Sequence, residues 1–358
     1  MDYLEEKIKS LYIYYEDVTQ SIDELDHMEL LEEYAEDLGI TSELKELQSY
    51  YTDFDEFIKH DMDAVVLANY AHQHAPFAIK CFERGIHVLS ECISNGTMAE
   101  GVELIRAYEK SSSIFMLAEN YPQMIFNREM KKICDGGTLG KILYAEGEYN
   151  HPLNSTDYEF YKGYIYFPEH WRNFLPRSYY VTHSLAPLMW STGATPKKVS
   201  AFGVFSPIDE YGTARYVGDS ATIMMTQNDD GSVFKFTGCG AFGAHHNAYR
   251  ICGKKGQIEN LRGMGNKVML RYNHWEIPEG MEEVNLYKPS WNDKDEDLIN
   301  NAGHGGGDYG LVRDFVEAVA SEDPGKLSSS IKDSIESHVM GFAAEKSRKS
   351  NNKVAVKA

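Results

Sequence analysis

The sequence contains no apolar run of about 18 residues, the length that a membrane-crossing helix needs. Its five cysteines form no Cys-x-x-Cys pair and no regular spacing, at positions 81, 92, 134, 239 and 252. We therefore predict reduced thiols, a cytoplasmic protein and no metal site. Basic residues are few, with 35 Lys and Arg against 55 Asp and Glu, and the net charge is −20. This charge argues against nucleic acid and anionic membrane surfaces as partners.

A strand–helix–strand pattern is the most informative feature that is present. Residues 64–68 form a short, continuous apolar run, as expected for a parallel strand that is buried on both faces. A polar loop, 69–74, leads into a helix that Gly85 ends. A second apolar run follows at 86–89, and the polar residues 91–95 come after it. Ligands bind beyond the carboxyl ends of such strands, so both polar segments are predicted to face one cleft.

Two domains fit a chain of 358 residues, and the fold class is α/β. The first, residues 1–120, is predicted to be a Rossmann-like, doubly wound parallel sheet whose N-terminal part is truncated. The second, residues 121–358, is predicted to be an α+β domain with an open, mainly antiparallel sheet, because short turns separate its strand-like runs. The expected elements are strands at 11–15, 114–118, 142–149, 198–204, 221–227, 232–238, 249–252, 256–260 and 267–272, helices at 1–10, 23–38, 44–58 and 124–135, and a mobile loop at 288–301.

The run Gly85-Ile-His-Val-Leu-Ser-Glu91-Cys92-Ile93, preceded by a strand, a His-containing loop and a helix, resembles the Gfo/Idh/MocA family of nicotinamide-dependent sugar enzymes. The resemblance covers nearly the whole chain from about Leu11. It implies NAD as cofactor, Glu91 near the nicotinamide and the sugar, and an exposed sheet face that forms a homodimer or homotetramer. The family's Glu-Lys-Pro triplet is only partly kept, because Cys92 and Ile93 stand where Lys and Pro are usual.

A second departure is the absence, near residue 1, of the Gly-x-Gly-x-x-Gly motif that lets a pyrophosphate approach a helix N-terminus. We expect the sequence to lack one strand and its glycine loop, and to bind NAD weakly as a result. The strand at 11–15 ends in Glu16-Asp17. The resemblance implies that Asp17 holds the adenosine ribose hydroxyls and favours NAD over its 2′-phosphate form. The alternative is that both acids cap the next helix.

The loop at 69–74 supplies Asn69, His72 and His74 as candidate cofactor-binding residues, because it follows a strand of the predicted sheet. For the two histidines the sequence leaves two roles open. They contact the nicotinamide ribose, or they cap the helix that follows.

Residues 178–190 carry the strongest chemical signal of the second domain. Ser178 is predicted to cap a helix on which Tyr180 and His183, at i and i+3, share one face. Pro187 has no N–H for the carbonyl of His183, so a kink is expected there. A lone Tyr or His on a helix is more often a core residue, but this pair beside a kink favours a site.

Tyr180-Val-Thr-His183, followed by Ala186-Pro187, resembles the NAD-dependent N-acetylgalactosaminidases of glycoside hydrolase family 109 and their relatives, where Gly-Pro is usual. The resemblance implies Tyr180 and His183 as catalytic acid/base residues, with Glu91 as a third catalytic residue. It implies hydride removal from a ring carbon, elimination of the aglycone, addition of water and return of the hydride. A sugar or cyclitol dehydrogenase with net NADH formation, and an inactive NAD- or sugar-binding oligomer, are the alternatives.

Four glycines between residues 303 and 307 surround His304, and Asp308 is predicted to begin a helix. Glycines let a backbone approach a ligand closely, although a tight turn into a capped helix explains them equally well. The pattern Gly-His-Gly-Gly-x-Asp resembles a motif that lies beside the sugar in the glycosidase branch. The resemblance implies that His304 binds substrate and that Asp308 is mainly structural.

Aromatic residues are dense between the two domains. Tyr149, His151, Trp171 and Arg172 lie there, together with tyrosines at 158, 161, 164 and 166. Aromatic rings stack on the C–H faces of sugars, so we predict an aromatic, substrate-binding lid. An oligomer interface is the alternative, because such interfaces also favour Tyr and Trp.

Overall fold

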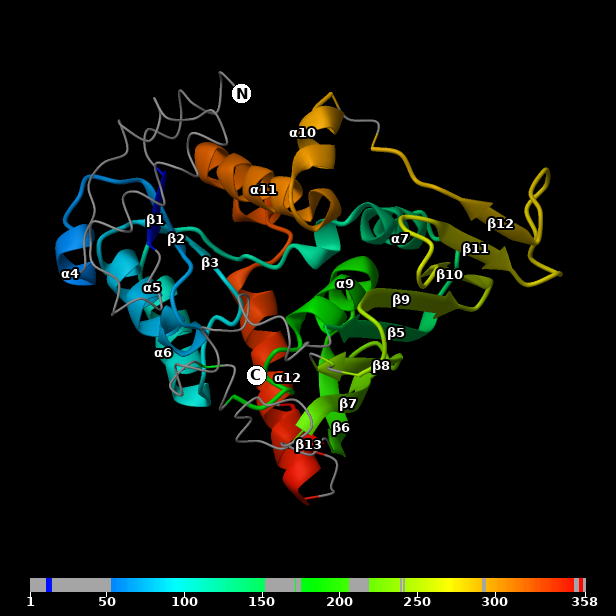
Figure 1. The fold of residues 1–358 in the computed structure, drawn as a ribbon, viewed down its shortest axis with the longest axis horizontal. Helices are drawn as coiled ribbons and strands as arrows, with labels where there is room; N and C mark the ends of the chain where they lie inside the picture. Colours follow the sequence, from blue (N-terminus) through cyan, green and yellow to red (C-terminus); the bar gives the residue numbers. More distant parts are fainter. Residues whose placement is uncertain are drawn as a thin grey trace.

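The computed structural model describes residues 11–14, 53–151, 171, 175–205, 219–238, 240, 242–291, 294–350 and 354–356. These residues form two sheets with helices packed against both. Helix α12 (Ile331–Ser350) runs between the sheets (Figure 1). The α/β class predicted from the sequence is confirmed.

The first sheet has four parallel strands in the order β1-β2-β3-β4. Their bounds are Leu11–Tyr14 (β1), Ala64–Leu67 (β2), His87–Ser90 (β3) and Phe115–Leu117 (β4). Val65, Val88 and Phe115 have no exposed surface, which explains why these strands are apolar at consecutive positions. The helices α5 (His74–Glu83) and α6 (Met98–Tyr108) connect successive strands, and Gly85 has the predicted left-handed φ of +74° after α5. The predicted strand–helix–strand unit is confirmed.

The second sheet has nine strands among the described residues, in the order β12-β11-β10-β9-β5-β8-β7-β6-β13, and only the pair β5 and β8 is parallel. Their bounds are Ile142–Asn150 (β5), Pro196–Phe205 (β6), Asp219–Asn228 (β7), Val233–Gly238 (β8), His246–Gly253 (β9), Gly256–Asn260 (β10), Val268–Tyr272 (β11), Val284–Tyr287 (β12) and Val354–Ala355 (β13). The helices α7 (Ile125–Asp135) and α9 (Thr182–Thr192) bury their apolar side chains with one face of this sheet. The predicted open, mainly antiparallel sheet is confirmed.

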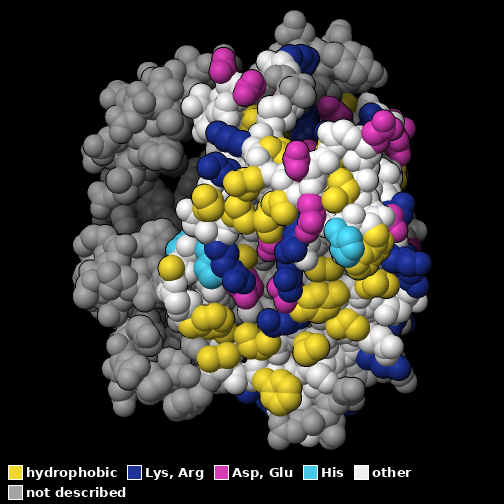
Figure 2. Space-filling view, turned by 90° about the vertical axis from the view of Figure 1, so that its right-hand side faces the viewer, with side chains coloured by type: hydrophobic (Ala, Val, Ile, Leu, Met, Phe, Trp, Pro, Cys, Tyr) yellow, Lys and Arg dark blue, Asp and Glu magenta, His cyan; other side chains and the backbone are white. Residues whose placement is uncertain are grey.

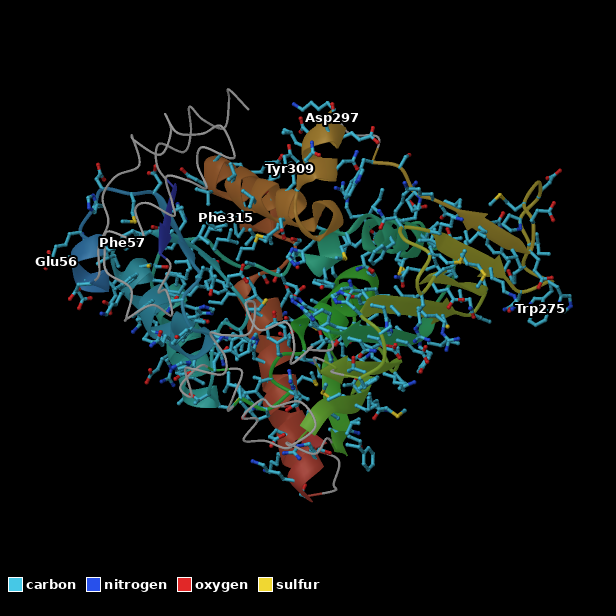
Figure 3. All side chains as sticks on the ribbon, viewed as in Figure 1. Glu56, Phe57, Trp275, Asp297, Tyr309 and Phe315 are labelled. Carbon is cyan, nitrogen blue, oxygen red and sulfur yellow. The ribbon has the colours of Figure 1, made fainter. Side chains whose placement is uncertain are left out.

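The C-terminal helices complete the core of the first sheet. Phe315 of α11 (Gly307–Ser321) packs with Ala64 and Leu89 of the parallel strands, toward which it points (Figure 3). Ile335 of α12 joins the core on the other side, whereas Met340 of the same helix belongs to the core of the second sheet. Helix α12 therefore connects the two cores. The domain border at residue 120 stays a prediction.

Two predicted elements are wrong in part. The predicted helix over 44–58 does not run through Asp53, which has an extended backbone and accepts hydrogen bonds from the N–H groups of two following residues. It caps a separate short helix, α4 (Phe54–Phe57). The segment 288–301, predicted as a loop, ends in the helix α10 (Glu296–Asn301), which buries Ile299.

Predictions for residues 1–10 and 15–52, Asp17 included, lie outside the described residues. No helix in the described part of the chain is both long and apolar enough to cross a membrane. The same residues contain no cluster of three or more His, Cys, Asp or Glu that could hold a metal ion.

Candidate active site

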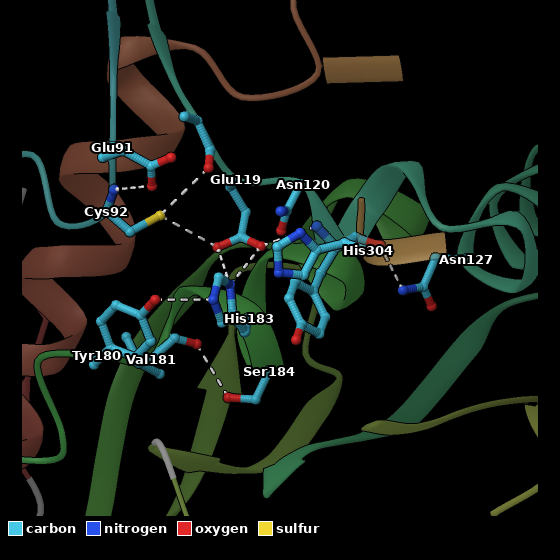
Figure 4. A network of polar contacts seen from close by, with 12 residues as sticks. Glu91, Cys92, Glu119, Asn120, Asn127, Tyr180, Val181, His183, Ser184 and His304 are labelled. Carbon is cyan, nitrogen blue, oxygen red and sulfur yellow. Dashed lines mark hydrogen bonds and ion pairs between the residues drawn. The ribbon is translucent and has the colours of Figure 1, made fainter. Parts of the chain in front are cut away.

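Polar residues follow three neighbouring parallel strands. Asn69 comes shortly after β2, Glu91 and Cys92 after β3, and Glu119 after β4. The first turn of α9 brings His183 against Glu119 (Figure 4). The carboxyl edge of the parallel sheet thus meets the N-terminal end of α9. Ligands of such sheets bind at the carboxyl edge.

His183 connects a carboxylate to a phenol. Its Nδ1 lies 2.9 Å from both carboxylate oxygens of Glu119, and its Nε2 lies 3.0 Å from the Tyr180 hydroxyl (Figure 4). Glu119 has no exposed surface, and His183 is also buried. The three side chains form one continuous hydrogen-bonded relay, which we call the Tyr–His–Glu relay.

The charge of Glu119 sets the direction of this relay. Burial alone would raise the pKa of Glu119, but His183, Thr182 and the N–H of Tyr121 together hold that pKa below its usual value. An ionised carboxylate only accepts hydrogen bonds, so Nδ1 of His183 must carry the shared proton. Nε2 is then left to accept the O–H of Tyr180. A histidine in this state can take the tyrosine's proton, and the carboxylate stabilises the imidazolium that forms.

Helix α9 begins later than predicted. Val181 precedes its first helical residue, so Tyr180 lies outside the helix, and the predicted pair at i and i+3 on one helical face is wrong. The predicted capping role of Ser178 is also wrong, because its hydroxyl donates to Glu345 of α12 at 3.4 Å. The side chains of Tyr180 and His183 still meet, one from the turn before the helix and one from its first turn.

The first turn of α9 lies directly on the second sheet. A Cβ atom at Gly147 in β5 would overlap the backbone carbonyl of Ser184, so only glycine permits this approach. The Ser184 hydroxyl donates to the carbonyl of Thr237 in β8. Both contacts fix the distance between the second sheet and the first turn of α9, which carries His183.

Aromatic rings surround His183. The ring of Tyr121 stacks on the imidazole with centroids 4.1 Å apart, and Tyr149 meets it edge-on at 4.7 Å. Trp171 lies 5.4 Å from the ring of Tyr180. Of the residues predicted to form an aromatic lid, Tyr149 and Trp171 are therefore placed beside the relay.

His304 is also close to Tyr121, with ring centroids 6.1 Å apart. Its backbone has a left-handed φ of +52°, and its Nδ1 lies 2.9 Å from Asp308. The hydrogen bond to Asp308 raises the pKa of His304, against the effect of burial. Asn120 donates a second hydrogen bond to Asp308 at 2.6 Å. Asp308 thus orients His304, and the substrate-binding role of His304 stays a prediction.

The candidate cofactor residues occupy different environments. Both ring nitrogens of His74 lie against backbone carbonyls, Nδ1 at 2.7 Å from Ile93 and Nε2 at 2.8 Å from Asn69. Burial lowers the pKa of His74 to about 4. Its side chain therefore lies between the loop after β2 and the loop after β3 and contacts the backbone of both. Burial also lowers the pKa of His72, which lies beside Tyr70. Contact of either histidine with a cofactor stays a prediction.

Glu91 and Cys92 follow β3. Glu91 is an exposed residue, but desolvation by the surrounding protein raises the pKa of its carboxyl, against a hydrogen bond from the N–H of Cys92. The thiol of Cys92 is buried and lies 3.6 Å from a carboxylate oxygen of Glu119. Burial raises the pKa of this thiol well above its ordinary value, so it is neutral. The peptide bond between Cys92 and Ile93 is cis.

The remaining predicted substrate-binding residues are His151 and Arg172. His151 is close to Tyr149, at 6.1 Å between ring centroids, and to His245, at 4.8 Å. Arg172 lies outside the described residues.

Sequence reasoning missed Glu119 and Tyr121, which it treated only as a domain border. The signal was present, because both follow the buried strand at 114–118, and the rule that selected Asn69 and Glu91 applies equally to them.

Comparisons with known proteins agree with the family resemblance. No protein-family model matches the sequence. A Bacteroides fragilis (strain YCH46) protein named glycosyl hydrolase family 109 protein 1 is 29% identical over 133 residues, 36% of this chain and 27% of the relative. A Stenotrophomonas maltophilia (strain K279a) protein named glycosyl hydrolase family 109 protein is 20% identical over 305 residues, 74% of this chain and 65% of the relative. The chain thus matches between about a quarter and two thirds of these relatives' length.

Among solved structures, levoglucosan dehydrogenase in complex with NADH and levoglucosan has the same fold. Its TM-score is 0.72 at 18% identity, over 97% of this chain and 90% of that chain. The predicted resemblance to the Gfo/Idh/MocA enzymes and to glycoside hydrolase family 109 is confirmed.

Proposed function

We propose that this protein is an NAD-dependent enzyme acting on a sugar or glycoside, with net glycoside hydrolysis as the outcome. The Tyr–His–Glu relay carries the proposal, because it joins a tyrosine hydroxyl, a proton-accepting histidine and a buried carboxylate in series. Tyr121 and Tyr149 beside it offer aromatic faces on which sugars stack. The relatives named for glycoside hydrolase family 109 support the reaction class.

The loop after β2 fits a bound cofactor. Asn69 is 6% exposed, and neither atom of its side-chain amide has a hydrogen-bond partner among the described residues. An unsatisfied buried polar group costs about 1–3 kcal/mol, which a polar ligand would recover. Bound NAD would supply an acceptor that takes and returns a hydride. Asn69, His72 and Glu91 are proposed to hold it, with Asp17 at the adenosine ribose and His74 supporting the loop.

Proton transfer is assigned to the relay. The Tyr180 oxygen accepts a proton from the substrate while its own proton passes to Nε2 of His183. Glu119 stabilises the resulting imidazolium, and the reverse transfer returns the proton to the substrate. His304, oriented by Asp308, hydrogen-bonds substrate hydroxyls next to Tyr121. Positioned acid/base groups of this kind contribute about 10²–10⁴-fold to a rate.

The competing function is a sugar or cyclitol dehydrogenase with net NADH formation. Dehydrogenases of the family use the Lys of the Glu-Lys-Pro triplet, and Cys92 occupies that position here. A buried thiol whose pKa is raised stays neutral and supplies no ammonium group. This difference supports hydrolysis over simple oxidation.

His183→Ala and Tyr180→Phe test the proposal. Each is expected to lower kcat for NAD-dependent cleavage of an aryl glycoside by about 10²-fold or more. Affinity for NAD should stay near the wild-type value, because neither side chain belongs to the loops that follow the parallel strands. Unchanged turnover in both variants would contradict the assignment. Loss of the folded state, measured by circular dichroism, would instead show that Tyr180 and His183 are core residues.

We further propose that copies of the chain associate through the open face of the second sheet. Phe202, Met225 and Leu286 on this face are 66%, 51% and 53% exposed. Between the apolar groups lie ion pairs such as Glu146–Arg250, at 3.0 Å. Figure 2 shows hydrophobic side chains gathered on either side of a charged band in which Lys and Arg lie beside Asp and Glu. Two such faces can pair apolar groups with apolar groups while their charges compensate.

A further inference from the structure

Helix α9 contains Pro187 at the position that would normally donate a backbone hydrogen bond to the carbonyl of His183, a member of the relay. In an α-helix each carbonyl accepts the N–H four residues later. Pro187 follows His183 by four residues and has no N–H to donate. The carbonyl of His183 therefore has no partner from that position of its own helix, and His183 is a buried residue.

A side chain from the second sheet takes the place of the missing donor. The hydroxyl of Tyr249 in β9 donates to the carbonyl of His183, with the two oxygens 2.5 Å apart. The donor and the acceptor are 66 residues apart in the sequence. The backbone of the proposed proton acceptor is thus tied to the sheet by one phenol.

Tyr249 is held rigidly enough to act as such an anchor. It is 2% exposed, and its ring stacks with that of Phe126 in α7 at 6.0 Å between centroids. Its backbone N–H donates to the side chain of Asn260 at 2.7 Å. Burial raises the pKa of Tyr249 well above its ordinary value, so the hydroxyl keeps the proton that it donates.

We propose that Tyr249 is a positioning residue that sets the catalytic geometry of His183 by replacing the helical hydrogen bond that Pro187 removes. This inference rests on the proposed function of His183. Without the anchor, the first turn of α9 is free to shift, and the imidazole moves relative to Glu119 and Tyr180. The proline keeps the carbonyl available to the sheet, so the pair Pro187 and Tyr249 couples the helix to β9.

The test is a double-mutant cycle that uses Tyr249→Phe, Pro187→Ala and the double variant. Tyr249→Phe keeps the ring packing and removes only the donor. It is expected to lower kcat by about 10- to 10²-fold, as small displacements of catalytic groups do, without a change in NAD affinity. Pro187→Ala restores an N–H for the His183 carbonyl. The double variant should therefore recover most of the lost kcat, which a loss of packing would not allow.

Turnover is measured with p-nitrophenyl N-acetyl-α-galactosaminide and NAD, and Tyr272→Phe serves as the matched control. Tyr272 is a buried tyrosine of the same core, on β11, and its variant should keep wild-type kcat. Wild-type kcat in Tyr249→Phe would overturn the inference. A kcat in the double variant as low as that of Tyr249→Phe would also overturn it.

A second readout does not depend on turnover. Nitrogen-15 resonances of the His183 ring should show a changed tautomer balance in Tyr249→Phe and the wild-type balance in the double variant; unchanged resonances would overturn the positioning role. The proposed function is judged separately. If His183→Ala abolishes turnover while Tyr249→Phe does not reduce it, only the inference fails. Full turnover in His183→Ala would overturn both.

Discussion

Glu119 decides what His183 can do. A buried carboxylate against Nδ1 directs Nε2 toward Tyr180, and this choice of ring nitrogen defines the relay. The spacing of Tyr180 and His183 was readable in the sequence because the two are three positions apart. The position of Glu119 after a buried strand was also readable, but its pairing with His183 was not, because the two are 64 residues apart and meet only when β4 ends beside α9.

Glu119→Gln is expected to lower kcat by about 10²-fold or more, with little change in NAD affinity. A glutamine amide can donate to Nδ1, which would move the ring proton to Nε2 and leave Tyr180 without its acceptor. Steady-state kinetics with an aryl glycoside checks this. The matched control is Glu129→Gln on α7, whose carboxylate accepts from Tyr287 of β12 rather than from a relay residue and whose loss should leave kcat unchanged. Wild-type kcat in Glu119→Gln would remove the carboxylate from the mechanism.

His338 of α12 makes stability depend on pH. Its Nδ1 donates to the carbonyl of Ser334 at 2.6 Å, and its Nε2 accepts the N–H of Ser94 at 3.2 Å, so the neutral ring is satisfied. Burial lowers its pKa to about 4, as it does for His74. The unfolded chain binds these protons first, near pH 6.5. The stabilisation is therefore complete above pH 6.5 and is lost as the pH falls toward 4, by about 3 kcal/mol for each histidine.

Urea unfolding between pH 7 and pH 4.5 measures this loss. His338→Asn keeps a donor near the position of Nδ1 but does not titrate, so its stability should fall less steeply with pH than that of the wild type. His274→Asn, at an exposed position next to Trp275, should keep the wild-type slope. Identical slopes for His338→Asn and the wild type would contradict the account.

Helix α9 shows which part of an element a sequence predicts. Its existence and its internal Pro187 were predicted, and its C-terminal Gly193 has a left-handed φ of +71°. Its start was placed too early, because Ser178 is a good N-cap by type but donates instead to Glu345 of a distant helix. Local propensity was overridden by a tertiary contact. The same holds for α10, where burial of Ile299 forms a helix in a segment whose composition is that of a loop.

Gly147→Ala tests how closely α9 must approach the second sheet. The added methyl group would overlap the Ser184 carbonyl, so α9 must move or the sheet must bend, at about 1–3 kcal/mol or more of stability. Because the shift occurs next to His183, kcat should fall as well. Thermal unfolding and kinetics check both. Gly96→Ala, where the methyl group meets only ordinary contacts, should change stability by less than about 0.5 kcal/mol. Equal stabilities of the two variants would contradict the close approach.

The two-sheet architecture follows from patterns that are local in sequence. Continuous apolar runs predicted the parallel sheet, and runs separated by short turns predicted the antiparallel one. What those patterns did not predict is the return of the C-terminal helices to the first sheet, where Phe315 and Ile335 lie in its cores. Such contacts depend on the path of the whole chain, and no local pattern encodes them.

Self-association through the open sheet face predicts a specific disruption. Phe202→Lys combined with Met225→Lys places charges on two exposed apolar positions of β6 and β7, and the oligomer should dissociate. Light scattering after size-exclusion chromatography measures the mass. Met98→Lys, at an exposed methionine on α6, should leave the oligomer intact. A wild-type mass for the double variant would place the interface elsewhere.

Hydrolysis that uses NAD without consuming it is the central claim, and one recording tests it. p-Nitrophenol release from an aryl glycoside and NADH absorbance are followed together, with and without added NAD, for the wild type and for His183→Ala. The account predicts release by the wild type that requires NAD, no accumulation of NADH, and release at least about 10²-fold slower in the variant. NADH accumulating in step with substrate consumption, or release that proceeds equally in His183→Ala, would contradict it.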